Sequence, residues 1–151
     1  MIVIGSDHGG LELKEAIQAA LAARGAEVED YGTDRGDSVD YPDFAEKVAG
    51  AISRGEAELG ILVCGTGIGM SIVANKFTGV RAALATDEFM ARMAREHNNA
   101  NILVLGGRVL TAEKAVKMVN VWLDSHYEGG RHQRRLDKIT QLEAAVRAGK
   151  L

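Results

Sequence analysis

Short apolar segments alternate with longer amphipathic segments along the whole chain, a pattern typical of βαβ units around a parallel sheet. We expect strands over residues 2–4, 27–31, 59–64, 80–85 and 102–105. The amphipathic segments predict helices over residues 11–25, 42–54, 68–77, 87–96, 111–123 and 131–147. No linker or internal repeat interrupts them. The pattern therefore predicts one α/β domain over residues 1–151 with an appended C-terminal helix.

The composition narrows the class of protein. With 151 residues, 46% of them hydrophobic, the chain can bury a full core. Its formal charge of −3 argues against nonspecific nucleic-acid binding, and no apolar run approaches the roughly 20 residues of a membrane helix. Residues 1–7 resemble no signal peptide, and a single cysteine allows no intrachain disulfide. We expect a cytoplasmic protein that binds neither nucleic acid nor membranes.

Reactive side chains follow the predicted strands at their carboxyl ends. They are Asp7-His8, Cys64-Gly65-Thr66-Gly67, Thr86-Asp87 and Gly107-Arg108. Ligands of open α/β sheets bind at this edge. We therefore expect the functional site there.

Cys64 ends one predicted strand and is followed by Gly65, Gly67 and Gly69. A GxGxxG dinucleotide fingerprint begun at Gly65 would need glycine at position 70, so the spacing excludes it. The turn either offers backbone N–H groups to an anion or is merely a glycine-lined connection. A lone cysteine is more often a small buried hydrophobe, but a thiol beside a helix N-terminus can act as a general base. No signature of a cysteine protease accompanies it.

Two histidine positions carry further hypotheses. Asp7-His8 could contact sugar or phosphate oxygens, or could simply cap the following helix. The four histidines show no paired-ligand spacing, which argues against a metal site. His97 opens the polar run 97–101, whose simplest interpretation is a loop that ends a helix.

The position of His97 raises a geometric problem. It precedes its strand, so it belongs to the opposite edge of the sheet from Cys64, and a strand of five residues spans roughly 17 Å. If the two residues act together, His97 must come from another subunit. We therefore hypothesise a homodimer with active sites shared between subunits.

The last predicted helix combines charge with an apolar stripe. Arg131 and Arg135 are four positions apart and share a face, where they would either bind phosphate or lie in solvent. The stripe fits packing against this chain or against a partner subunit, and it consists of Leu136, Ile139, Leu142 and Val146.

Taken together, these segments resemble the ribose-5-phosphate isomerase B family, which also includes galactose-6-phosphate and allose-6-phosphate isomerases. The resemblance runs in order through Ser6-Asp7-His8, residues 38–43, residues 64–69, residues 95–101 and Gly129-Gly130-Arg131-His132. It implies a three-layer αβα sandwich with a Rossmann-like five-stranded parallel sheet. It also implies a dimer or dimer of dimers that interconverts aldose and ketose phosphates without a metal or organic cofactor.

The resemblance further implies roles for individual residues. Cys64 matches the general base, and His97 matches the residue that opens the furanose ring. Asp7 would assist at a ring oxygen, and Thr66 would hydrogen-bond or relay protons at the sugar oxygens. Substrate and phosphate contacts would come from His8, Tyr41, Gly65, Gly67, Ile68, Gly69, Asn98, Arg108, Arg131 and Arg135.

Two alternatives to a D-ribose 5-phosphate isomerase stay open. The substrate could be a six-carbon sugar phosphate, such as allose 6-phosphate or galactose 6-phosphate. The chain could instead be a non-catalytic sugar-phosphate binding protein, which has no need of a base at Cys64.

Overall fold

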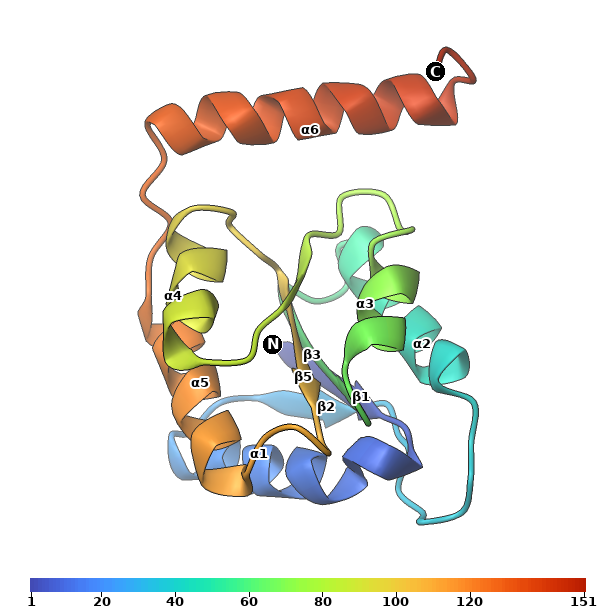
Figure 1. Ribbon diagram of the computed structural model, residues 1–151, viewed down its shortest axis with the longest axis vertical. Helices are drawn as coiled ribbons and strands as arrows, with labels where there is room; N and C mark the ends of the chain where they lie inside the picture. Colours follow the sequence, from blue (N-terminus) through green and yellow to red (C-terminus); the bar gives the residue numbers. More distant parts are fainter.

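The computed structural model describes all 151 residues, and its five strands form one parallel sheet (Figure 1). The strand order across the sheet is β2-β1-β3-β5-β4. The strands are β1 (Ile2–Ser6), β2 (Val28–Asp30), β3 (Leu59–Cys64), β4 (Ala82–Leu84) and β5 (Ile102–Gly106). β3 lies at the centre, and β4 is an edge strand.

Helices connect the strands in the expected alternation. They are the 3-10 helix η1 (His8–Gly10) and the α-helices α1 (Leu11–Ala23), α2 (Tyr41–Ser53), α3 (Ile68–Ala74), α4 (Glu88–Glu96), α5 (Ala112–Asp124) and α6 (Arg131–Arg147). Thr111 caps α5, because its side chain accepts from the Lys114 N–H. No helix is both long enough and apolar enough to cross a membrane.

The sheet is buried between two helical layers, which confirms the expected αβα sandwich. α1, α4 and α5 pack on one face, and α2 and α3 pack on the other. Alternate residues of β3 point to opposite faces of the sheet. Ile61 and Val63 pack in the core beneath α1, α4 and α5, and Leu62 and Cys64 pack in the core beneath α2 and α3. Because both faces are covered, the central strands are apolar throughout rather than alternating with polar residues.

Several elements, including α1 and β2, are shorter than their sequence predicts, and two of the differences share one cause. α3 ends at Ala74 rather than at residue 77, and β4 covers residues 82–84 rather than 80–85. Asn75 explains both differences. Its Nδ2 donates to the Ser71 and Ala82 carbonyl oxygens at 3.1 and 3.0 Å, and its Oδ1 accepts from the Ala82 N–H at 2.9 Å. One side chain thus closes the helix and marks the start of the edge strand.

The sequence pattern also did not predict the 3-10 helix η1.

α6 lies apart from the other helices, across the edge at which the strands begin (Figure 1). Only Leu136 of its apolar stripe is buried, whereas Ile139, Leu142 and Val146 are at least half exposed. Polar contacts hold the far end of α6: the Gly79 N–H donates to Glu143 at 3.0 Å. Packing within this chain therefore covers little of the stripe.

Candidate active site

The thiol of Cys64 lies at the carboxyl end of β3 and is 5% exposed. The Gly67 N–H donates to its Sγ at 3.2 Å, and the Ile68 N–H donates to Thr66 Oγ1 at 3.2 Å. No hydrogen bond within the chain uses the N–H groups of Gly65 or Thr66. The turn therefore places a thiol, a hydroxyl and free backbone donors within a few residues of one another.

The turn requires glycine at position 67. Its φ is +84°, and a Cβ there would lie 2.6 Å from Leu84 Cδ1. α3 begins at the next residue, so the chain reverses from strand to helix within three residues of the thiol. Glycine here serves the tight connection, as the simpler interpretation held, and also exposes backbone donors.

Asp7 and His8 follow β1 and lie beside this turn. A Cβ on Gly9 would be 3.3 Å from the Gly65 nitrogen, so the two loops are in contact. Asp7 Oδ1 accepts from the Gly10 N–H at 3.1 Å, which confirms its capping role and leaves Oδ2 without a partner in the chain. His8 Nδ1 accepts from the Val39 N–H at 3.1 Å. The proton of a neutral His8 ring is therefore on Nε2, where it can be donated to an anion.

Arg108 and Tyr41 complete this edge of the sheet. The Arg108 N–H donates to the Gly65 oxygen at 2.9 Å, and its Nη1 lies 3.3 Å from the place of a Gly65 Cβ. The Tyr41 ring lies against Gly69, where a Cβ would approach Cζ to 2.5 Å. The structure thus brings ten of the expected site residues together: Asp7, His8, Tyr41, Cys64, Gly65, Thr66, Gly67, Ile68, Gly69 and Arg108.

His97 and Asn98 lie at the opposite edge of the sheet. In the register of β3 and β5, Cys64 pairs with Gly106 at one end and Gly60 pairs with Ile102 at the other. His97 ends α4 and precedes Ile102, so the length of the sheet, roughly 17 Å for five residues, separates it from Cys64. Within one chain these residues do not form a common site.

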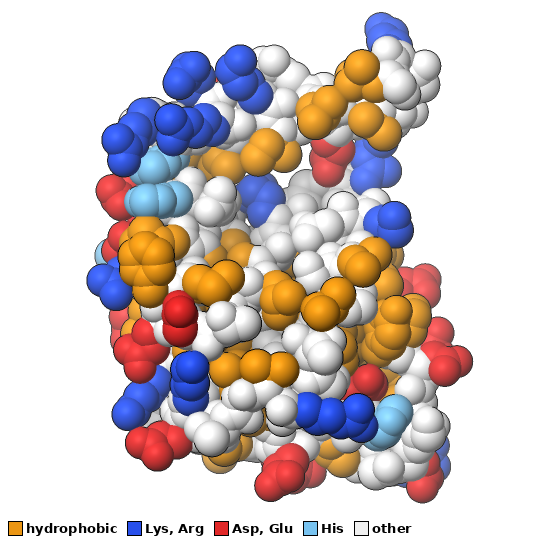
Figure 2. Space-filling view, in the orientation of Figure 1, with side chains coloured by type: hydrophobic (Ala, Val, Ile, Leu, Met, Phe, Trp, Pro, Cys, Tyr) orange, Lys and Arg blue, Asp and Glu red, His pale blue; other side chains and the backbone are white.

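Arg131 and Arg135 belong to the same edge as His97. Both are exposed in the first two turns of α6. Figure 2 shows positively charged side chains gathered over the start of this helix. They are not near Arg108, so a single chain offers cations at both edges of the sheet.

Two residues that the sequence analysis did not assign surround His97. Its ring stacks on that of His132, with centroids 4.1 Å apart and planes 17° apart, and its Nε2 lies 3.5 Å from Glu128 Oε1. The three side chains offer ligand atoms within 4.8 Å of one another, close enough to consider a metal. Nearly parallel rings, however, confine their nitrogen lone pairs to two nearly parallel planes, and the lone pairs of metal ligands must converge on one point. The geometry fits stacking better than coordination.

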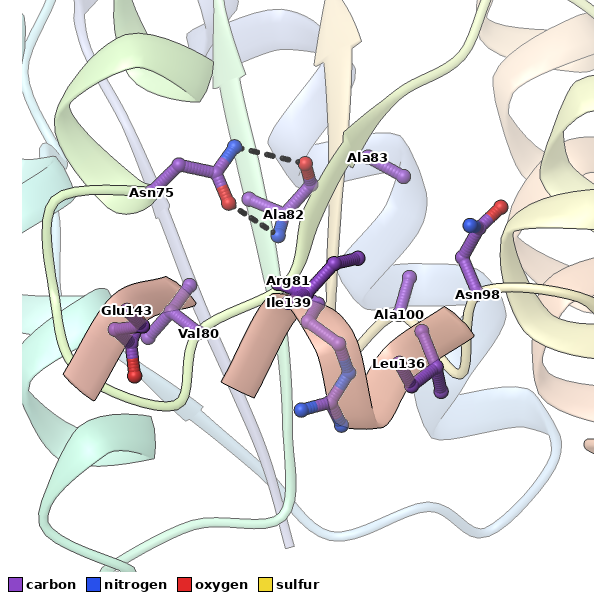
Figure 3. A pocket seen from close by; sticks show the side chains of 10 residues that line it. All are labelled: Asn75, Val80, Arg81, Ala82, Ala83, Asn98, Ala100, Leu136, Ile139 and Glu143. Atoms are coloured by element: carbon purple, nitrogen blue, oxygen red, sulfur yellow. Dashed lines mark hydrogen bonds between the residues drawn. The ribbon is translucent and has the colours of Figure 1, made fainter. Parts of the chain in front are cut away.

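A cavity of about 370 Å³ lies between α6 and the edge strand, away from Cys64 (Figure 3). Its lining is mainly apolar and includes one expected site residue, Asn98. The other lining residues are Asn75, Val80, Arg81, Ala82, Ala83, Ala100, Leu136, Ile139 and Glu143. The cavity holds no nucleophile or paired acid and base, so we assign the chemistry to the Cys64 edge.

Known proteins are similar to this chain in sequence and in fold. Residues 2–139 match the family model described as Ribose/Galactose Isomerase. Ribose-5-phosphate isomerase B of Escherichia coli K12 is 48% identical over 142 residues, covering 94% of this chain and 95% of that protein. D-erythrulose-4-phosphate isomerase of Pectobacterium atrosepticum is 44% identical, covering 94% of each. The crystal structure of ribose-5-phosphate isomerase B from Mycoplasma genitalium with bound ribulose-5-phosphate has a TM-score of 0.91 and 46% identity, covering 95% of each chain.

Proposed function

Because this chain belongs to the ribose/galactose isomerase family of aldose–ketose isomerases, we propose that it interconverts D-ribose 5-phosphate and D-ribulose 5-phosphate. The Escherichia coli relative is named for this substrate, and the Mycoplasma genitalium structure contains its ketose form. Family membership favours an enzyme over a sugar-phosphate binding protein. The observation that carries the chemistry is the Cys64 thiol beside free backbone N–H groups.

Cys64 is the general base of the proposed reaction. Its thiolate takes the proton from C2 of the open aldose, the C2–H electrons form the C1–C2 double bond, and the carbonyl oxygen becomes an enediolate oxygen. The same sulfur returns this proton to C1 while the C2 hydroxyl proton passes to the O1 oxyanion, so that C2 becomes the carbonyl carbon of the ketose. The N–H groups of Gly65 and Thr66 stabilise the developing oxyanion, and loss of one such donor typically costs roughly 3–4 kcal/mol.

Neighbouring side chains orient the sugar. The Thr66 oxygen accepts from the Ile68 N–H, which leaves its own O–H to donate to a sugar oxygen. The free Oδ2 of Asp7 is positioned to accept from a sugar hydroxyl. Tyr41 forms a wall over Gly69. His8 and Arg108 supply donors for the phosphate from the same subunit as Cys64.

His97 opens the furanose ring in the site of a second subunit. Apolar side chains are exposed on the face that runs from α3 across β4 to α4 (Figure 2), and they include Ile68, Ile72, Phe89 and Met90. An exposed apolar face of this kind favours association. A two-fold axis through it, perpendicular to the strands, places the His97 edge of one subunit at the Cys64 edge of the other. Asn98, Arg131 and Arg135 would arrive with His97.

The number of carbons in the sugar differs among the relatives. The Pectobacterium relative is named for a four-carbon sugar phosphate, and the family model also covers galactose isomerases. The backbone donors and the base recognise C1 and C2, which all these substrates share. We also propose that the enzyme works in the cytoplasm, where a single catalytic thiol stays reduced.

A substrate panel in D₂O tests this function. The purified chain should convert ribose 5-phosphate and incorporate deuterium from solvent, and it should act more slowly on allose 6-phosphate, galactose 6-phosphate and erythrulose 4-phosphate. Replacing the base by Cys64→Ala should lower kcat by roughly 10³-fold while the variant still binds ribulose 5-phosphate. Cys64→Ser is the matched variant of nearly the same size. Inactivity on every sugar, or full isotope exchange by Cys64→Ala, would refute the proposal.

A further inference from the structure

Three side chains from different segments form one cluster at the amino edge of the sheet. His97 ends α4, Glu128 belongs to the connection between α5 and α6, and His132 lies in the first turn of α6. His132 is 7% exposed, whereas the His97 side chain is 36% exposed. The cluster therefore has a buried inner ring and an outer ring that is open to a ligand or partner.

The backbone holds this arrangement from two sides. The Glu128 N–H donates to the Glu96 oxygen at 3.0 Å, which fixes the connection against the end of α4. Gly129 and Gly130 then take φ values of +65° and +55°, and this turn directs α6 back over α4. As a result, His132 reaches His97 across 35 positions of sequence.

We propose that Glu128 and His132 are positioning residues that fix the His97 ring for its work in the active site of the neighbouring subunit. This inference rests on the ring-opening role proposed for His97. An imidazole on a helix end has two rotatable side-chain bonds, and a partly exposed ring samples several rotamers. Stacking on His132 restricts the ring plane, and Glu128 selects which edge faces inward. Glu128 Oε1 lies 3.5 Å from Nε2, so the carboxylate faces that edge of the ring.

The charges around the pair are consistent with this role. Burial lowers the pKa of His132, and the neighbouring His97 and Arg131 lower it further, while Glu128 opposes the shift and Arg135 adds to it. A neutral His132 ring can stack on His97 without repelling a proton that His97 carries.

The test separates ring opening from proton transfer. Ribulose 5-phosphate is acyclic, so exchange of its C1 hydrogen with D₂O requires the enediolate step but not the furanose. We expect Glu128→Ala and His132→Ala to lower net isomerisation by about tenfold or more, the scale at which histidine-orienting partners act. Exchange at C1 should fall much less, so the ratio of exchange to conversion rises. His97→Ala should show the same signature more strongly.

Conservative variants and controls keep the result interpretable. His132→Phe preserves the stack and Glu128→Gln preserves an oxygen acceptor, so each should recover much of the activity that its alanine variant loses. His126→Ala and Glu113→Gln change exposed residues outside the cluster and should match the wild type. If His132→Ala does not fold, His132→Phe and the two Glu128 variants still test the positioning role.

The outcomes separate three claims. The positioning role is overturned if exchange and conversion fall in parallel. It is also overturned if both alanine variants keep activity within twofold of wild type. An unchanged ratio in His97→Ala overturns the ring-opening role on which it rests. A wild-type enzyme that converts no sugar phosphate overturns the proposed function itself.

Discussion

At the scale of single residues, one buried cation organises the loop beside the site. Lys14 is 1% exposed, and its Nζ donates to both oxygens of Asp30 at 2.8 Å and to the Thr33 carbonyl. The loop continues to Val39, whose N–H determines the tautomer of His8. Lys14 therefore fixes the start of a segment whose Val39 N–H holds the ring of His8, a proposed phosphate contact.

Removing one partner of this ion pair should be costly. Asp30→Ala leaves Lys14 charged and buried without its carboxylate, so we expect a loss of about 3 kcal/mol in the free energy of unfolding. Lys14→Met should cost less, because Asp30 is partly exposed and can be hydrated. Chemical denaturation of both variants measures the difference. Equal, small losses would show that the pair is not a stabilising unit.

The pair also predicts how stability depends on pH. Burial raises the pKa of Asp30, but hydrogen bonds from Lys14 and the Gly32 N–H outweigh it and hold the pKa below its usual value. Because the pKa of Asp30 is lower in the folded state, the ionised carboxylate stabilises the protein at any pH above the pKa in the unfolded state, which is about 4. This stabilisation is lost as the pH falls through the pKa in the folded state. Below pH 4 the wild type should therefore lose part of its advantage over Asp30→Ala.

At the scale of elements, Asn75 protects the open edge of the sheet. Its side chain occupies both the N–H and the carbonyl of Ala82 on β4, as Figure 3 shows. Unpaired groups on an edge strand are a template for pairing with another chain. Periodicity did not reveal this role, because the amphipathic pattern places Asn75 inside the helix expected over residues 68–77.

We expect Asn75→Ala to expose that edge. The loss of two side-chain hydrogen bonds to β4 should lower the free energy of unfolding by about 1–2 kcal/mol and increase aggregation on heating. Light scattering during a thermal ramp measures the second effect. Asn98→Ala, at an exposed position without such bonds, is the control. Identical aggregation in the two variants would contradict a protective role.

Elements were predictable where local pattern decides them. The central strands and most helices follow from apolar runs, and Thr111 and Pro42 mark helix starts by their chemistry. The ends of α3 and β4 were not predictable, because one tertiary hydrogen-bonding side chain sets them. For the same reason spacing could not reveal that His132 stacks on His97: the contact depends on a turn at two left-handed glycines. The signals were that Glu128 directly precedes those glycines and that His132 ends the segment Gly129-Gly130-Arg131-His132, on which the family resemblance partly rests.

At the scale of the whole molecule, a single chain places its candidate site residues at two opposite edges of the sheet. Cys64, Asp7 and His8 lie at one edge, and His97 with the arginines of α6 lies at the other. Motif order selected the candidate residues, and strand direction correctly predicted that Cys64 and His97 would be separated within one chain. What the sequence could not supply is the surface that would reunite them, since exposure of α3 and α4 side chains depends on how the layers pack.

The exposed apolar face should control assembly. Phe89 is 63% exposed and Ile72 is 57% exposed, so Phe89→Asp or Ile72→Asp should leave the monomer folded while placing a charge in the proposed interface. We expect these variants to become monomeric and to lose isomerase activity together, as measured by light scattering coupled to gel filtration. Monomers that keep full activity would contradict a shared site.

The most direct measurement of the shared site is activity in a purified heterodimer. Cys64→Ala and His97→Ala chains, carrying different affinity tags, are each expected to form inactive homodimers, and co-expression gives a mixed dimer. If Cys64 and His97 of different subunits build each site, the mixed dimer has one intact site and should recover about half of wild-type activity. A mixed dimer as inactive as its parents would contradict the account.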